Sequence, residues 1–299
     1  DPYTPRPHQR EAINAVTKRF KTEDRGQLIM ACGTGKTMSA LWIKEALKAK
    51  NTLVLVPSLF LLSQTLKEWT ANRLDDYGAL CVCSDETVSK DEDAPSSEVP
   101  FPVTTDVSEI RQFLSQSGSR VIFSTYQSSQ KVAEAQAHGD IPEFDLVIAD
   151  EAHKCAGQTS SDFGTVLDNS KVRAAKRLFM TATPRTFSAH HSRLAADRGL
   201  DVVSMDDETV FGGVFHRLTF GQAIADELLS DYRVVIVGVD DPTIREFIEN
   251  RELLQTDSGI EDDAETLASK IGLLKAVKDY DLRRMISFHS YVKGAQNFS

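Results

Sequence analysis

The chain has 299 residues, of which 41% are hydrophobic and 26% charged, and its formal net charge is -10. This length is too great for one ordinary domain and suits one large domain with a smaller one. The composition is that of a soluble globular protein, and no apolar run approaches the roughly 20 residues that span a bilayer, so we expect no membrane partner. The acidic balance argues against a simple basic nucleic-acid binder, but not against a protein that grips phosphates through backbone N–H groups.

The N-terminus and the cysteines indicate the setting of the chain. Asp1–Arg10 is polar, carries no signal peptide and lacks an initiator Met, so we expect an internal start and a longer parent protein. The four cysteines are Cys32, Cys81, Cys83 and Cys155, and such sparse use is typical of the reducing cytoplasm, our expected location. Because Cys81 and Cys83 alternate with apolar residues, we expect buried strand thiols rather than zinc ligands.

Apolar, β-rich runs alternate with amphipathic stretches of helical length. Strands are predicted, in chain order, at Gln27–Met30, Thr52–Val56, Leu80–Cys83, Arg120–Ser124, Asp145–Ala149 and Arg177–Met180. Helices are predicted around them at Pro7–Phe20, Lys36–Ala49, Leu59–Arg73, Val107–Gln116 and Gln127–Ala137. Several strand segments are near-continuous apolar runs, as expected of strands buried on both faces of a parallel sheet. The alternation predicts a doubly wound α/β domain.

The segments outside this alternation predict a loop and a second domain. Asp85–Asp106 is rich in acidic residues, Pro and Ser, so we predict a surface loop. Residues 211–230 are predicted as a connector that ends in a short helix at Gln222–Leu229. A second lobe is then predicted to begin with a strand, a helix and a strand at Tyr232–Val239, Asp262–Tyr280 and Arg284–His289. The predicted domains are therefore 1–225 and 226–299.

A glycine-rich segment at Met30–Thr37 (MACGTGKT) follows a predicted strand and opens a predicted helix, which is the context of a phosphate-binding P-loop. Gly33 and Gly35 allow backbone N–H groups to turn inward around phosphates. Lys36 supplies a point charge to the β and γ phosphates, and Thr37 supplies a hydroxyl to Mg²⁺. A chance glycine-rich turn is the weaker alternative. The expected nucleotide-binding residues here are Gly33, Thr34, Gly35, Lys36 and Thr37.

An acidic pair follows the apolar run at Phe144–His153 (FDLVIADEAH). The run places Asp150 and Glu151 at the carboxyl end of a strand, where ligands bind in open α/β sheets. We expect Asp150 to hold Mg²⁺, and Glu151 to orient or deprotonate the attacking water. His153 lies one step further, close enough to sense the γ phosphate. The alternative is an exposed loop pair, but the P-loop upstream favours the catalytic interpretation.

A third segment, Phe179–Pro184 (FMTATP), ends the last strand in two hydroxyls, Thr181 and Thr183. Alone it would be interpreted as a Thr-rich turn before Pro, and only its position after the acidic pair favours a functional interpretation.

The order of the segments along the chain resembles the first motor lobe of a superfamily 2 helicase of the DEAH-box-like type. That order is Arg6–Gln9, the P-loop, Val56–Ser58 with Gln64, Ser124–Gln127, Asp150–His153 and Thr181–Pro184.

Within this superfamily the chain most resembles the helicase (res) subunits of type I, type III and single-chain type I-like restriction enzymes. Two segments carry this closer resemblance, Thr181–Arg185 and Phe211–Tyr232. Arg284–Ser290 resembles motif IV, near the start of the family's second lobe. The resemblance implies two RecA-like lobes, a P-loop NTPase fold, and ATP with Mg²⁺ as cofactors.

The resemblance also implies further site residues. Gln9 would read the adenine edge, with Arg6 supporting that pocket, and Thr181 and Thr183 would link hydrolysis to lobe movement together with His153. Gln9 could instead be a plain polar helix residue. The residues expected on the nucleic-acid face are Pro57, Ser58, Gln64, Ser124, Thr125 and Tyr126. Pro57–Ser58 is equally well interpreted as a helix N-cap.

The implied activity is that of an ATP-dependent DNA translocase or helicase, with duplex DNA as the preferred partner. The remaining lobe and any nuclease or methyltransferase domain would lie outside this segment, in the same polypeptide or complex. The arginine finger of the second lobe is absent from these residues, so we expect ATP binding but weak hydrolysis by the chain alone. A DNA repair or RNA helicase of the same superfamily remains an alternative, as does a P-loop protein that uses ATP as a switch.

Overall fold

The computed structural model describes residues 2–84, 102–137, 139, 141–158, 162–187, 202–232, 236, 253–255 and 261–286. The chain divides into two compact units, Asp1–Ser230 and Asp231–Ser299. The assignment of the second unit to the start of another RecA-like lobe stays a prediction.

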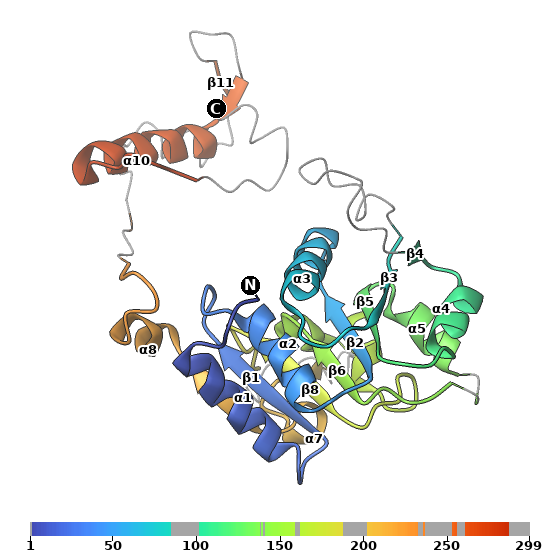
Figure 1. The fold of residues 1–299 in the computed structure, drawn as a ribbon. Coiled ribbons are helices and arrows are strands. Elements are labelled where there is room, and N and C mark those ends of the chain that lie inside the picture. The colour runs from blue at the N-terminus through green and yellow to red at the C-terminus, as the bar shows by residue number, and fades with distance from the viewer. Residues whose placement is uncertain are drawn as a thin grey trace. The chain divides into compact units, whose positions relative to one another are not determined.

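An eight-stranded, wholly parallel sheet forms the centre of the first unit (Figure 1). Its strand order is β10-β1-β8-β6-β2-β5-β3-β4. The bounds, in the same order, are Val214–Leu218, Arg25–Met30, Arg177–Thr181, Leu146–Ala149, Asn51–Val56, Arg120–Thr125, Gly78–Val82 and Val103–Thr104. Every pairing in the sheet is parallel, so all strands end at one edge. That edge is where open α/β sheets bind ligands.

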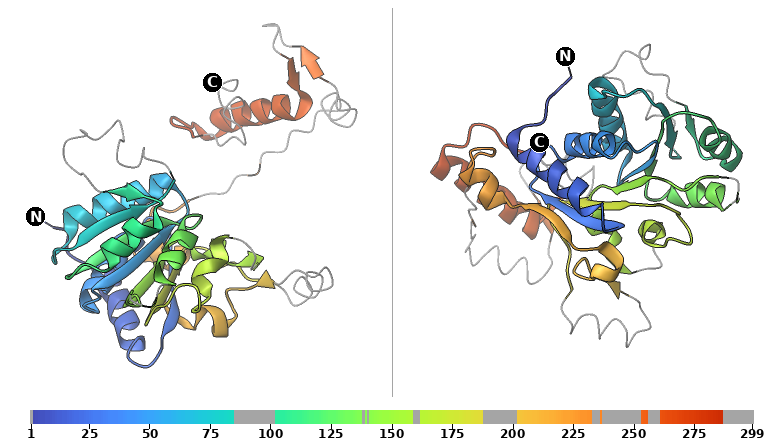
Figure 2. Two further views of the ribbon diagram at one scale, coloured as in Figure 1. Left: turned by 90° about the vertical axis from the view of Figure 1, so that its right-hand side faces the viewer. Right: turned by 60° about the horizontal axis from the view of Figure 1, so that its bottom comes forward.

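Helices cover both faces of this sheet, as the two views of Figure 2 show. One core packs α1 (Pro7–Arg19), α2 (Lys36–Ala46) and α3 (Leu59–Asn72) against alternate strand residues. The other core packs α4 (Val107–Leu114), α5 (Ser129–Gln136) and the 3₁₀ helix η3 (Asp162–Leu167) against the remaining ones. In β2, Val54 and Val56 face the first core while Leu53 and Leu55 face the second. The predicted doubly wound α/β class is therefore confirmed.

All six strands and five helices predicted for this unit are present, with ends shifted by a few residues. Two strands of the eight-stranded sheet were not predicted: β4 lies inside the expected loop 85–106, and β10 lies inside the expected connector 211–230. The short antiparallel pair of β7 (Gly157–Gln158) and β9 (Val202–Val203) was not predicted either. β10 pairs with β1 at the edge of the sheet, and its partly exposed face explains its polar residues His216 and Arg217. Residues 85–101 of the predicted loop lie outside the described residues.

The predicted helix at Gln222–Leu229 is also corrected, since α8 spans Phe220–Ala225. It begins earlier because Thr219 caps it: the Thr219 hydroxyl accepts from the N–H of Gln222, whose side chain accepts in return from the N–H of Thr219. It ends earlier because Glu227 adopts a left-handed backbone conformation with φ of 57°. That conformation cannot continue a right-handed helix.

The second unit contains the hairpin strands β11 (Leu253–Gln255) and β12 (Glu261–Asp263), followed by α10 (Ala264–Tyr280). The helix confirms the prediction at Asp262–Tyr280 apart from its first two residues, which belong to β12. The strand predicted at Tyr232–Val239 lies largely outside the described residues, and residues 284–286 of the other predicted strand have no regular structure. Within the described residues, no helix is long and apolar enough to cross a bilayer.

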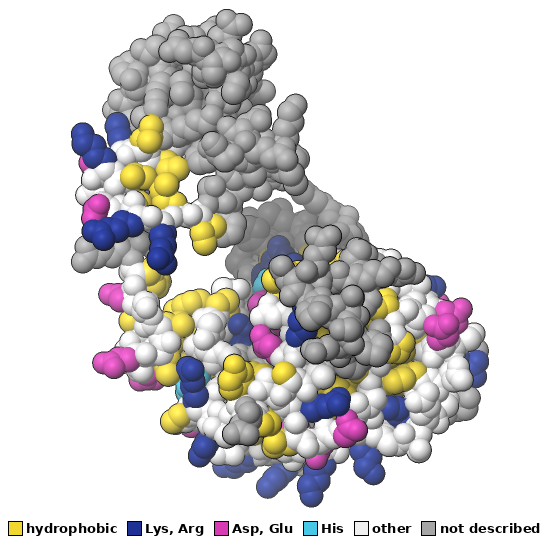
Figure 3. Space-filling view, turned by 45° about the horizontal axis from the view of Figure 1, so that its top comes forward, with side chains coloured by type: hydrophobic (Ala, Val, Ile, Leu, Met, Phe, Trp, Pro, Cys, Tyr) yellow, Lys and Arg dark blue, Asp and Glu magenta, His cyan; other side chains and the backbone are white. Residues whose placement is uncertain are grey.

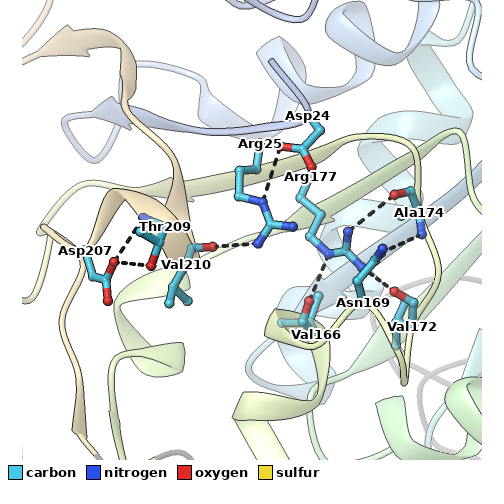
Figure 4. A network of polar contacts seen from close by, with 10 residues as sticks. All are labelled: Asp24, Arg25, Val166, Asn169, Val172, Ala174, Arg177, Asp207, Thr209 and Val210. Carbon is cyan, nitrogen blue, oxygen red and sulfur yellow. Dashed lines mark hydrogen bonds and ion pairs between the residues drawn. The ribbon is translucent and has the colours of Figure 1, made fainter.

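A buried arginine secures the amino-terminal end of β8 (Figure 4). Only 1% of Arg177 is exposed, and its guanidinium donates to the backbone carbonyls of Val166, Val172 and Ala174. Burial, followed by the nearby positive charge of Arg25, lowers the pKa of Arg177 to about 10, so it still carries its charge at neutral pH. The hydrogen bonds from this guanidinium thus hold the segment that precedes β8 in place. Thr181 lies at the opposite end of β8.

We predict that Arg177→Lys destabilises the chain by about 2–4 kcal/mol, because an ammonium group cannot replace a planar fork that serves three buried carbonyls. Urea denaturation with an unchanged m-value would measure the loss. Arg217→Lys is the matched control, since Arg217 is exposed on β10, and its effect should stay within about 0.5 kcal/mol. Equal stability of the Arg177 variant and the wild-type chain would contradict the prediction.

Candidate functional site

The P-loop predicted at Met30–Thr37 joins the end of β1 to the start of α2. Gly33 and Gly35 have φ of 80° and 84°, a left-handed conformation that glycine adopts without steric cost. The hydroxyl of Thr34 donates to the carbonyl of Ala31 at 2.7 Å, which tightens the turn between them. No backbone carbonyl among the described residues accepts from the amides of Gly33, Gly35, Lys36 or Thr37. These amides and the helix N-terminus form a nest suited to an anion.

The start of α1 lies against this loop. The Gln9 side chain accepts from the backbone N–H of Arg6 at 2.9 Å and donates to the carbonyl of Gly35 at 3.2 Å. A β-carbon on residue 35 would lie 2.3 Å from the Gln9 amide nitrogen, so this contact needs glycine there. Gln9 is buried, whereas Arg6 is exposed. The structure therefore brings both predicted adenine-pocket residues to the P-loop.

A cavity of about 510 Å³ opens between the N-terminal segment and the P-loop. It is lined by the predicted residues Arg6, Gln9, Gly33, Thr34 and Gly35. Sequence reasoning missed the apolar and aromatic part of its wall, which comes from Tyr3, Met38 and Trp42. The positions of Met38 and Trp42, two and six residues after Lys36 on α2, were the available signal. Such a mixed lining suits a ligand with both an apolar ring and polar edges.

The acidic pair follows β6, as predicted. Asp150 is buried, and its carboxylate accepts the N–H of Glu151 at 2.9 Å. Burial, followed by the negative charge of Glu151, raises the pKa of Asp150 to about 6, while the positive charge of Lys36 and the hydrogen bond from the N–H of Glu151 act in the opposite direction. Glu151 has a left-handed backbone with φ of 50°, which is a strained conformation for a residue other than glycine. Strain and a buried carboxylate at one position are typical of a functional site.

A polar chain links the ends of β6 and β8. The Nδ1 atom of His153 lies 2.9 Å from the Thr181 hydroxyl and 3.3 Å from a carboxylate oxygen of Glu151. The backbone N–H of Thr183 donates to the same Thr181 hydroxyl at 3.1 Å. Burial lowers the pKa of His153, so its ring is neutral at pH 7. Four of the five residues predicted in these two segments, Glu151, His153, Thr181 and Thr183, are therefore linked in one series of contacts.

Lys36 and the acidic pair face one site, although their strands are not adjacent. β8 lies between β1 and β6, so Thr181 stands between the P-loop and Asp150 at the same sheet edge. The Lys36 charge lowers the pKa of both Asp150 and His153, which places it within electrostatic reach of each. The ends of three neighbouring strands thus carry a positive charge, two carboxylates and a hydroxyl at the same sheet edge.

The first three residues expected on a nucleic-acid face lie at the start of α3. Pro57 is buried, and the Ser58 hydroxyl accepts the N–H of Leu61 at 3.3 Å, so the helix N-cap interpretation is confirmed. Gln64 is exposed, and its amide donates to Glu68 at 2.9 Å. Of the three, Ser58 and Gln64 have side chains that reach the surface.

The other three differ from the expectation, since their side chains are buried. The Ser124 hydroxyl donates to the carbonyl of Val82 at 3.0 Å, and the Thr125 hydroxyl donates to the side-chain hydroxyl of Ser128 at 3.2 Å. The Tyr126 hydroxyl donates to the carbonyl of Asp150 at 2.7 Å. These side chains hold neighbouring loops, and Tyr126 supports Asp150, the first residue of the acidic pair. A contact of this segment with nucleic acid stays a prediction.

On the one face that Figure 3 shows, the charges of the described residues do not define a track. On the face that Figure 3 shows, Lys and Arg side chains are scattered among acidic ones rather than gathered in one continuous band. A protein with a net charge of -10 must confine any phosphate contacts to local groups.

Comparisons with known proteins agree with the family resemblance predicted from the sequence. Residues 2–186 match the family model described as Type III restriction enzyme, res subunit. A probable helicase of African swine fever virus is 30% identical over 247 residues, which cover 82% of this chain and 25% of the viral protein. A Type I restriction enzyme EcoAI endonuclease subunit of Escherichia coli is 27% identical, over 79% of this chain and 24% of that subunit. The chain thus spans about a quarter of the length of these curated relatives.

Two solved structures of Type ISP restriction-modification enzymes share the fold. LlaBIII, described as ATP-dependent and bound to DNA, is 32% identical to this chain with a TM-score of 0.71. The match covers 93% of this chain and 19% of the LlaBIII chain. A nuclease-deletion mutant of LlaGI, in complex with a DNA substrate mimic, is 35% identical to this chain with a TM-score of 0.63. The match covers 83% of this chain and 22% of the LlaGI chain. Because the family model covers more than half of the chain, we conclude that the chain belongs to the family of type III restriction enzyme res subunits and has the RecA-like fold of helicase motors.

Proposed function

We propose that this chain is the ATP-binding motor segment of a DNA translocase or helicase that serves a restriction-modification or phage-defence enzyme. The observation that carries the proposal is the shared position of Lys36, Asp150 and the His153–Thr181 contact at one sheet edge. A P-loop alone would suit many ATP-binding proteins. The chain of polar contacts from Glu151 through His153 to Thr181 supports a motor, because a switch protein has less need to couple the water-activating residue to a separate strand.

In this proposal the nucleotide lies across the P-loop. The adenine ring would enter the cavity bounded by Tyr3 and Trp42, next to Gln9, and the phosphates would meet the nest and Lys36. Magnesium suits the remaining groups, since the hydroxyl of Thr37 and the carboxylate of Asp150 are hard oxygen donors. The buried Asp150 fits a divalent cation, because such an ion would stabilise its charged form against the cost of burial. The bound ion would neutralise charge on the phosphates.

Glu151 is the proposed water-positioning residue. Its carboxylate is only partly buried and is held by His153 at 3.3 Å, so it can accept a proton from a water molecule aligned with the γ phosphate. His153, neutral at pH 7, can exchange its hydrogen bonds between Glu151, Thr181 and a phosphate oxygen without gaining charge. A change at the γ phosphate would thereby reach β8 and Thr183.

Duplex DNA is the proposed track, on the likeness to LlaBIII and LlaGI, which were solved with DNA or its mimic. The 30% identity to a viral probable helicase favours a second candidate, a helicase outside restriction systems. Ser58 and Gln64 remain proposed contacts to the nucleic-acid backbone, because their side chains reach the surface at the start of α3.

The deciding experiment uses the full gene product with Lys36→Ala and Glu151→Gln. Lys36→Ala should abolish ATP binding, whereas Glu151→Gln should keep binding and lose about 10²–10⁴-fold in hydrolysis, because only the water-activating step is removed. Hydrolysis should be stimulated by duplex DNA more than by single strands or RNA. Stimulation by single strands or RNA alone would favour the second candidate. Full hydrolysis by the Glu151 variant would refute the assigned role.

Thiol reactivity tests the nucleotide site in the chain itself. Cys32 is an exposed free thiol within the P-loop, whereas Cys81, Cys83 and Cys155 are buried. Saturating ATP with Mg²⁺, at about ten times its Kd, should slow alkylation of Cys32 about tenfold, as followed by mass spectrometry. The matched control is Lys36→Ala, in which nucleotide should give no protection. An unchanged alkylation rate in the wild-type chain would argue against ATP at this loop.

The buried carboxylate predicts a pH-dependent stability. The pKa of Asp150 is 3.8 ordinarily and about 6 when folded, so its ionisation opposes folding. The penalty is absent below pH 3.8, grows as the pH rises towards 6 and is constant above that. We therefore expect Asp150→Asn, without ligand, to be more stable at pH 8 by about 1–3 kcal/mol, with the difference vanishing near about pH 3.5.

Urea denaturation across this pH range measures the effect. Asp145→Asn is the matched control at the other end of the strand, where the carboxylate accepts the N–H groups of Lys50 and Asn51 at 2.7 and 2.8 Å. That variant should lose about 1 kcal/mol, since it weakens two charge-assisted hydrogen bonds. An Asp150→Asn chain that is less stable than wild type at pH 8 would contradict the burial argument.

A further inference from the structure

Three carbonyls of the P-loop are held from outside by side-chain N–H groups. His8 Nε2 lies 2.9 Å from the carbonyl oxygen of Thr34, and Gln9 donates to the carbonyl of Gly35 at 3.2 Å. The indole N–H of Trp69 donates to the carbonyl of Thr37 at 3.0 Å. A carbonyl oxygen can only accept, so His8 must carry its hydrogen on Nε2.

The direction of these bonds matters for phosphate binding. In each peptide unit the N–H points opposite to the C=O, so a carbonyl that is held outward directs the following N–H inward. The anchored carbonyl of Thr34 belongs to the same peptide unit as the N–H of Gly35, and that of Gly35 to the N–H of Lys36. Both amides lack a backbone carbonyl partner among the described residues. Their inward orientation is what an anion nest requires.

We propose that His8 is a positioning residue that sets the P-loop in its phosphate-binding conformation before nucleotide arrives. The proposal rests on the proposed ATP-binding function and extends it to a residue outside the cavity. Gln9 lines the cavity and can touch the ligand, whereas His8 is 91% buried, does not line the cavity, and acts only through Thr34. The hydroxyl of Thr34 is tied to Ala31 on the other side, so the residue is fixed from two directions.

Two substitutions separate the hydrogen bond from the ring. His8→Phe keeps a buried ring but removes the donor, and His8→Gln restores an N–H at about the reach of Nε2. We expect His8→Phe to weaken binding of ATP with Mg²⁺ by about fivefold to tenfold, the size of one net hydrogen bond to a buried acceptor. His8→Gln should bind within about twofold of the wild-type chain.

The ligand pair identifies the part of the site that is affected. Inorganic tripolyphosphate with Mg²⁺ has the phosphates of ATP but no adenine, so a misplaced nest should weaken both ligands by the same factor in titration calorimetry. Val16→Ala is the control on the same helix, since Val16 is buried away from the P-loop. It should lower the melting temperature and leave both affinities unchanged.

Each outcome decides the matter. An equal loss for both ligands in His8→Phe, with recovery in His8→Gln, supports the proposal. Unchanged affinities, or a loss for ATP alone, overturn it while leaving the proposed function intact. A wild-type chain that binds neither ligand overturns the proposed function, and the inference with it. If His8→Phe does not fold, His8→Asn gives the same test, because its shorter side chain ends before it reaches the Thr34 carbonyl.

Discussion

The site depends on the parallel pairing of β1, β8 and β6. β1 pairs in parallel with β8, and β8 pairs in parallel with β6. The P-loop, Thr181 and Asp150 therefore lie at the same edge of the sheet. A shift of one residue in β8 would turn Thr181 to the other face and break its contact with His153. The chemistry is thus a consequence of register, and register is set by the two buried faces of each strand.

Polar groups at the two edges of the sheet differ in how well their charges are paired. At the amino edge the charges are satisfied: Arg177 donates to three carbonyls, Asp145 accepts two backbone N–H groups, and Arg120 donates to Asn51 and the carbonyl of Leu114. At the carboxyl edge Asp150 is buried beside a like charge and Glu151 is strained. Stability is concentrated at one edge so that the other can keep unfavourable features that a ligand would stabilise.

Residue type and periodicity were sufficient for the strands, most helices, and the positions of Lys36, Asp150, Glu151 and Thr181. They were insufficient where tertiary contact decides. β10 carries polar residues because it is an edge strand, so its sequence is typical of a connector. Ser124 and Tyr126 are polar by type, but their hydroxyls are satisfied inside the fold, which no spacing reveals. Tyr3 and Trp42 line the cavity only because α1 and α2 pack together.

The P-loop shows why a motif and a working site are different things. Its conformation depends on segments far apart in sequence: His8 and Gln9 from α1, Trp69 from α3, and Leu229 from the segment after α8. The positive φ of residue 33 favours glycine, and a β-carbon there would also lie 3.1 Å from the Leu229 side chain, which would have to shift slightly. The sequence motif identifies the loop, but contacts from the rest of the first unit determine the direction in which its amides point. Within the loop the hydrogen bonds run from Thr34 to the carbonyl of Ala31, so most of the contacts that constrain its carbonyls come from outside it.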